Sequence, residues 1–168
     1  GTLGVEVLRE LPGAAAMAWL VPVGGGGLIA GIGAALKRNA SRAYLFGVQA
    51  ESSAFMHALY HRGSQEGVPD LPTLADGLSG AVEAVSLTIP MVRQSVDEIV
   101  LVSEEEIAGA IAFAWHTYGE RIEGSGAVGL AALLAEKVTK RPVLVVVSGG
   151  NIQPEVHEEI CNRYGGKS

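Results

Sequence analysis

Short apolar runs alternate along the chain with longer segments in which apolar residues recur every three or four positions. The short apolar runs are typical of strands buried on both faces, and the run at Pro142–Val147 is the most strongly apolar. Strands are predicted at Trp19–Val23, Tyr44–Gln49, Glu98–Val102 and Pro142–Val147. Strands that alternate with helices predict an α/β fold of three layers, with a largely parallel sheet covered by helices on both faces.

The helical spacing places helices between and beyond these strands. They are predicted at Leu3–Leu11, Leu28–Arg38, Ser53–His61, Ile107–Tyr118 and Gly126–Lys137, with a final helix after Asn151. Ser103 and Glu106 have the spacing of a capping box at the start of the fourth helix. From Arg62 to Thr88 the pattern weakens into a polar stretch with glycine and proline, interpreted as a long excursion. No repeat or second domain is visible, so residues 1–168 are predicted to form a single domain.

Two glycine-rich turns follow the first and the last predicted strand. Ligands of parallel sheets bind beyond the carboxyl ends of the strands, where Gly24–Gly27 and Ser148–Asn151 are expected. The first turn opens a helix, whose free amides and positive dipole end favour an anion such as phosphate. The Ser148 hydroxyl in the second turn suits a neutral ring nitrogen. The alternatives are a tight turn without ligand for the first and an ordinary helix N-cap for Ser148.

The glycine turn after the first predicted strand can be compared with two other phosphate-binding motifs. A Walker loop is excluded because no Gly-Lys-Ser/Thr follows the glycines. A dinucleotide fingerprint is nearly met by Gly25, Gly27 and Ala30, with Glu51 as a possible ribose acceptor after the next strand. The nicotinamide-dinucleotide module therefore stays open on these residues, although it gives no role to Ser148.

The two glycine turns belong to a longer series of short segments: 21–31 (VPVGGGGLIAG), 47–51 (GVQAE), 73–78 (TLADGL), 102–107 (VSEEEI), 123–127 (EGSGA) and 147–151 (VSGGN). In their sequence and their order, these segments resemble the threonine dehydratases and serine racemases, which are fold-type-II pyridoxal-phosphate enzymes. The resemblance covers nearly the whole chain and implies part of a tryptophan-synthase-β-like fold. The form of the phosphate segment favours the dehydratase and racemase branch.

The resemblance implies a cofactor site for pyridoxal 5′-phosphate. Backbone amides of Gly24, Gly25, Gly26, Gly27 and Leu28 would hold the phosphate, and Ser148 would bond the pyridine nitrogen. Gly77 and Glu123 would lie near the ring and the substrate. The family eliminates water from a small hydroxy-amino acid and releases ammonia and a 2-oxo acid, so a lyase acting on threonine or serine is expected. The alternatives are a serine racemase-like enzyme and a non-enzymatic amino-acid sensor or partner subunit.

Two departures from the family pattern stand out. The proline of the family's Glu-Pro-Ser/Ala-Gly segment is Gly124, which is expected to loosen the turn beside the ring. Gln49 stands where the racemases are taken to carry a metal-binding glutamate, and an amide is a poor cation ligand, so no metal is expected. His57 and His61 are four residues apart on a predicted helix without the metalloprotease glutamate, which does not favour zinc.

The family's chemistry also needs a lysine that binds the cofactor. The chain has Lys37, Lys137, Lys140 and Lys167. Lys37 is expected roughly 15 Å along the helix from the glycines, and Lys137 and Lys140 at the opposite edge of the sheet. Lys167 is expected in a terminal tail. No catalytic residue is therefore assigned, and the chain is predicted to be a fragment, inactive alone, whose missing N-terminal half carries the lysine.

Charge and composition narrow the partners. The formal net charge is −6 without a basic cluster, which argues against nucleic acid. A single cysteine, Cys161, fits a reducing, cytoplasmic compartment. Ala14–Leu36 is uncharged and long enough to span a bilayer, but Pro22 and the four glycines interrupt it, so no membrane span is expected. The apolar surface left by a missing half predicts self-association, and the parent protein is expected to be a homo-oligomer.

Overall fold

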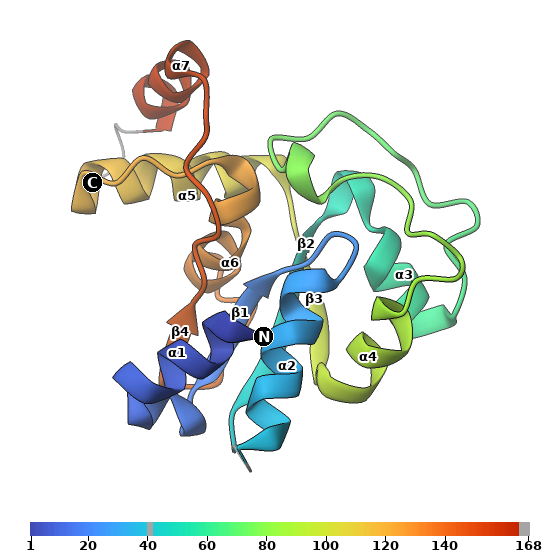
Figure 1. Ribbon diagram of the computed structural model, residues 1–168. Helices are drawn as coiled ribbons and strands as arrows, with labels where there is room; N and C mark the ends of the chain where they lie inside the picture. Colours follow the sequence, from blue (N-terminus) through green and yellow to red (C-terminus); the bar gives the residue numbers. More distant parts are fainter. Residues whose placement is uncertain (40–41, 165–168) are drawn as a thin grey trace.

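The computed structural model describes residues 1–39 and 42–164 and contains one parallel sheet (Figure 1). Within these ranges the strands are β1 (Ala18–Pro22), β2 (Tyr44–Ala50), β3 (Glu98–Val102) and β4 (Val143–Val145). They are ordered β3-β2-β1-β4 across the sheet. The predicted parallel α/β fold is confirmed. Because dinucleotide-binding sheets also begin with the order 3-2-1-4, the topology alone does not decide between the two cofactors.

Helices cover both faces of the sheet. One face carries α1 (Thr2–Glu10), α2 (Gly27–Arg38), α3 (Phe55–Arg62) and α4 (Thr88–Ser95). The other carries α5 (Glu104–Tyr118) and α6 (Gly124–Leu134), and α7 (Pro154–Tyr164) packs outside them on α5. Short 3-10 turns lie at η1 (Pro12–Ala16), η2 (Glu51–Ser53) and η3 (Asp76–Leu78). In Figure 1, α7 stands apart from the sheet at the far side of α5.

Alternating side chains of β1 build the two cores. Trp19 and Val21 point into the core beneath α2, whereas Leu20 points into the core beneath α5 and α6. All three are fully buried, which explains why the strand reads as a continuous apolar run. Full burial of such a side chain contributes about 1.5–3 kcal/mol. The helical spacing of Ile29 and Ile32 places both against the same core.

The start of α5 was predicted residue by residue. The Ser103 hydroxyl accepts from the Glu106 amide at 3.2 Å, and the Glu106 carboxylate accepts from the Ser103 amide at 2.8 Å. The capping box is therefore confirmed. At its other end, α5 stops at Gly119 in the left-handed conformation that glycine adopts without strain.

Two elements differ most from the prediction, and α6 also begins two residues earlier and ends three residues earlier than predicted. Helix α4 was missed, because it is short, carries Pro90 in its first turn and has no side-chain cap at its N-terminus. Strand β4 is shorter than predicted, and its side chains are only partly buried. Among the described strands it pairs with β1 alone, so it lies at the sheet edge and has a neighbour on one side only.

The uncharged stretch Ala14–Leu36 is divided between η1, β1 and α2. None of the helices within residues 1–39 and 42–164 combines the length and the apolar character needed to cross a bilayer.

The contact of α7 with α5 contains a buried histidine. The His157 ring packs edge-on against Trp115 with centroids 5.2 Å apart, and its Nε2 lies 3.6 Å from the Cys161 sulfur. Burial lowers the pKa of His157, and the positive charges of Arg121 and His116 lower it further. The docked helix therefore binds fewer protons than an undocked one.

We expect acid to weaken the docking of α7. Its full stability is present above the ordinary histidine pKa of about 6.5 and is lost as the pH falls below that value toward the lowered pKa of the docked state. Hydrogen exchange of the α7 amides at pH 7.5 and 5.5, with each rate divided by its intrinsic rate at that pH, should show lower protection in acid, and His157→Gln should flatten the difference. The control His61→Gln, on α3, should leave the pH difference unchanged. An unchanged pH response in His157→Gln would contradict the assignment of this effect to His157.

Candidate functional site

The two predicted glycine turns lie at neighbouring strands of the sheet. Strands β1 and β4 pair in parallel with Leu20 opposite Val145, and the Val146 amide donates to the Leu20 carbonyl at 3.0 Å. Since the carboxyl ends of parallel neighbours meet at one edge, the turns after β1 and β4 share that edge. The sheet order thus brings together two segments that are more than a hundred residues apart.

The turn after β1 has the backbone features of an anion site. Gly26 is left-handed with φ of 87° and is the N-cap of α2, with no side chain capping the helix. The first amides of a helix have no partner within it, so those of Gly27 and Leu28 remain available. Gly25, Gly27 and Leu28 are exposed. A Cβ built on Gly25 or Gly27 would meet no atom within 4 Å, so this side of the turn is open.

The predicted segment 73–78 lies against this turn. A Cβ on Gly24 would lie 2.9 Å from the Leu78 Cα, so only glycine permits this approach of the two backbones. The Gly77 amide donates to the Ser125 hydroxyl at 3.0 Å, which connects the segment to the start of α6. The 77–78 backbone therefore lies between the turn after β1 and the Glu123 segment.

Glu123 is attached to the turn after β4. Its carboxylate accepts from the Asn151 amide at 2.9 Å, and its own amide donates to the Gly149 carbonyl at 3.2 Å. Ser148 is exposed next to this junction. Because α7 begins only at Pro154, Ser148 is not its N-cap, and that alternative is wrong. All the predicted site segments thus form one connected group.

Gly124 does not loosen the turn beside this group. It is buried, and a Cβ on it would overlap the Leu74 carbonyl oxygen. The expectation of a loosened turn is therefore corrected, because glycine here allows two backbone segments to touch. Glycine in place of the family's proline therefore allows the 73–78 segment to pack directly on the start of α6.

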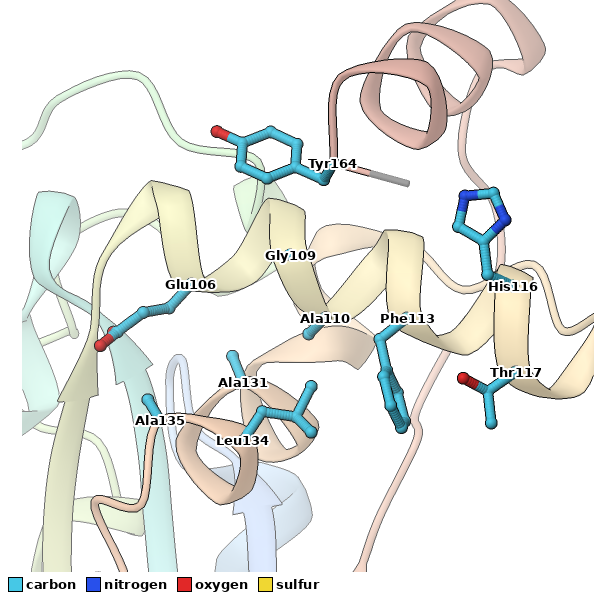
Figure 2. Close-up of a pocket in the computed structure, with 10 residues that line it drawn as sticks. All are labelled: Glu106, Gly109, Ala110, Phe113, His116, Thr117, Ala131, Leu134, Ala135 and Tyr164. Carbon is cyan, nitrogen blue, oxygen red and sulfur yellow. The ribbon is translucent and has the colours of Figure 1, made fainter. Parts of the chain in front are cut away.

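A polar hollow of about 650 Å³ opens beside these residues, lined among others by Asp76, Glu123 and Asn151. A second hollow of about 510 Å³ lies between α5, α6 and Tyr164, lined mostly by apolar groups such as Phe113 and Leu134 (Figure 2). The first contains predicted site residues, whereas the second contains none. The connected group at the sheet edge is therefore the candidate site.

The described lysines make their contacts elsewhere. The Lys37 amine, in the last turn of α2, donates to the Gln94 carbonyl at 2.5 Å, and Lys140 lies over the Tyr44 ring. The prediction that Lys137 lies at the edge of the sheet opposite the glycine turns is wrong. Its amine donates to the Leu101 carbonyl at 2.9 Å, near the carboxyl end of β3. There it is paired with the Glu106 carboxylate at 2.8 Å. Lys167 lies outside the described residues.

The candidate metal positions are engaged in protein contacts. The Gln49 side chain is buried, and its oxygen accepts from the His57 amide at 3.0 Å. The rings of His57 and His61 are in tilted contact, with centroids 4.4 Å apart and an interplanar angle of 53°. Within the described ranges, no group of three or more histidine, cysteine, aspartate or glutamate side chains is arranged to hold a metal ion.

Sequence reasoning missed two residues that hold the site together. Buried Ser125 accepts from Gly77, and the only available signal was its place in the quoted 123–127 motif. Glu104 was interpreted as helix-start charge, but its carboxylate accepts from the Ser52 hydroxyl at 2.8 Å and from the Leu74 amide at 2.7 Å. It thereby fastens the 73–78 segment to the start of α5. No local pattern indicates a contact across 30 residues.

The chain is an α/β protein whose parallel sheet has, at its carboxyl edge, a glycine turn that opens an uncapped helix. Residues 1–149 match the family of pyridoxal-phosphate dependent enzymes, and the chain belongs to this family. The dinucleotide alternative is thereby set aside.

Individual relatives refine the comparison. The chain is 42% identical over 164 residues to an L-threonine ammonia-lyase of Thermotoga maritima, covering 97% of this chain and 40% of the relative. Maize serine racemase superimposes with a TM-score of 0.82 at 28% identity, over 97% of this chain and 51% of the racemase. Threonine deaminase isoform 2 from Solanum lycopersicum superimposes with a TM-score of 0.81 at 28% identity, over 98% of this chain and 46% of the deaminase. The chain therefore spans about half or less of these relatives.

Proposed function

We propose that residues 1–168 supply the phosphate and ring-nitrogen sites of a pyridoxal-phosphate dependent dehydratase acting on a small hydroxy-amino acid, threonine or serine. The relative in Thermotoga maritima is named an L-threonine ammonia-lyase, and the superimposed tomato protein a threonine deaminase. The observation that carries the proposal is the uncapped start of α2, where Gly25 and Gly27 are exposed and a Cβ on either would meet no atom within 4 Å.

A phosphate dianion fits the residues present at this position. The amides of Gly25 to Leu28 are the donors, and the positive end of the α2 dipole adds attraction. The open side has no Cβ that would fill the cradle, whereas the closed side is in contact with Leu78 and the start of α4. Charge-assisted hydrogen bonds of this kind contribute about 1.5–3 kcal/mol each.

Ser148 is proposed to hold the ring nitrogen of the cofactor. Ser148 lies in the turn after β4, the strand that pairs with β1, and it is exposed, so its hydroxyl is accessible to a ligand. The bound cofactor supplies an electron sink that permits β-elimination. A hydroxyl, unlike a carboxylate, does not hold a proton on that nitrogen, which moderates the sink. Gly77 and Glu123 are proposed to border the ring and the substrate.

The cofactor-binding lysine is proposed to come from residues other than these 168, in an N-terminal half of the same protein. The occupied contacts of Lys37, Lys137 and Lys140 support this, as does the 40% share of the lyase that the chain spans. Strand β4 supports it independently, because Val147 is 49% exposed next to an edge strand of apolar residues. An apolar edge strand of this kind presents unpaired backbone groups with which a further strand can pair. A cytoplasmic homo-oligomer remains the proposed setting.

The test measures 2-oxobutanoate formed from threonine with pyridoxal phosphate. The 168-residue chain alone should give none, and the whole gene product should give steady turnover. Ser148→Ala in the whole product should lower kcat/KM about 2- to 10-fold, as expected for one hydrogen bond of about 0.5–1.5 kcal/mol.

Ser64→Ala is the matched control, because Ser64 lies on the surface after α3, where its hydroxyl accepts only from the Glu66 amide. It should leave kcat/KM unchanged. Steady turnover by the 168-residue chain would refute the proposed origin of the lysine, and a Ser148→Ala enzyme equal to wild type would refute the role of this hydroxyl.

A further inference from the structure

The turn after β1, Gly24–Gly27, is contacted by helix α4, which the sequence analysis did not predict. The Thr88 hydroxyl, in the first turn of α4, donates to the Gly25 carbonyl at 2.5 Å. The two residues are 63 positions apart in the chain. This is a tertiary contact from a side chain to the backbone of the turn itself.

The direction of this hydrogen bond fixes the orientation of one peptide group. The carbonyl of Gly25 and the amide of Gly26 belong to the same planar trans peptide and point in opposite directions. With its carbonyl held toward α4, this peptide must direct the Gly26 amide to the other side. Gly25 and Gly27 are exposed, and a Cβ on either would meet no atom within 4 Å, so we infer that this other side is the open one.

A second hydroxyl supports the first. Ser86 and Thr88 hydroxyls lie 2.7 Å apart, and the Thr88 amide donates to the Ser86 hydroxyl at 3.3 Å. Because the single proton of Thr88 goes to a carbonyl, which can only accept, Ser86 must donate its proton to Thr88. Donation from Ser86 polarises the Thr88 hydroxyl and strengthens its bond to Gly25.

The packing around Gly26 restricts the turn in the same direction. A Cβ on Gly26 would lie 3.1 Å from the Thr88 Cβ, 3.1 Å from Val92 and 2.9 Å from Met56. The left-handed residue therefore rests directly on α4 and α3, while its neighbours Gly25 and Gly27 are exposed. The turn has one supported face and one free face.

We propose that Thr88 is a positioning residue for anion binding: its hydroxyl locks the Gly25–Gly26 peptide so that the Gly26 amide is aimed at the bound phosphate. The inference rests on the proposed function, since it assumes that the turn holds the cofactor phosphate. It assigns to a residue outside the turn the preorganisation of one of its donors.

The test compares binding of pyridoxamine 5′-phosphate and of pyridoxamine to the whole gene product by calorimetry. Neither probe carries an aldehyde, so no lysine is needed to bind it. Thr88→Val keeps the shape and removes the hydroxyl, and it should reduce the affinity for the phosphorylated probe about tenfold while leaving that for pyridoxamine unchanged. Thr88→Ser should restore the affinity, which a purely structural role of the methyl group would not predict.

Ser95→Ala is the matched control, because the Ser95 hydroxyl lies on the same helix and bonds only back to the Met91 carbonyl. It should bind both probes as wild type does. If wild type prefers the phosphorylated probe and Thr88→Val keeps the full preference, the role of Thr88 is refuted and the proposed function stands. If wild type shows no preference for the phosphorylated probe, the proposed function fails and this inference with it.

Discussion

Replacing Gly26 by alanine should destabilise the protein by about 2–5 kcal/mol and abolish measurable phosphate binding. The left-handed backbone, φ of 87°, costs a residue with a Cβ about 1–2 kcal/mol. The new methyl would also press on Thr88 and Val92 at 3.1 Å, and overpacking of this kind costs about 1–3 kcal/mol. Urea unfolding and calorimetry with pyridoxamine 5′-phosphate measure the two effects.

Gly25→Ala is the matched control for the folding effect. Gly25 is not among the glycines with positive φ, and a Cβ there would meet no atom within 4 Å. The free energy of unfolding should stay within about 0.5 kcal/mol of wild type. Equal destabilisation by the two substitutions would show that the turn is not supported on one face only.

Gly124→Ala should also cause a large loss, of about 3 kcal/mol, because the methyl would overlap the Leu74 carbonyl and must displace the 73–78 segment. The hydrogen bond from Gly77 to Ser125 should break with that movement. Gly124→Pro, which introduces the proline of the family pattern, should also lower the free energy of unfolding, although proline suits the first position of a helix. Urea unfolding and hydrogen exchange of residues 73–78 provide the measurements.

Gly109→Ala serves as the control for glycine replacement in a helix. Gly109 lies within α5, and a Cβ there would meet no atom within 4 Å. Alanine should therefore stabilise the protein by about 0.5–1 kcal/mol through its better helix propensity. A Gly124→Ala protein that unfolds at the same urea concentration as wild type would contradict the close approach described for Leu74.

The strands, the capping box of α5 and the two glycine turns could be predicted from sequence because each depends on neighbouring residues. Buried strands need short apolar runs, and a capping box needs Ser103 and Glu106 three positions apart. The same locality explains the miss of α4, whose first turn contains proline and whose N-terminus has no capping side chain. Its helical state is supported by packing of Val92 in the core.

By itself, the sequence determined the layer architecture, the family resemblance and the positions of the glycine turns, since periodicity and glycine content act within a few residues. Only the tertiary structure decided that Thr88 supports Gly25, that Glu104 fastens the 73–78 segment and that Gly124 is required by Leu74. These contacts join residues 30 to 63 positions apart. The order of the strands and the packing of the helices on the sheet create them, and no local pattern encodes that arrangement.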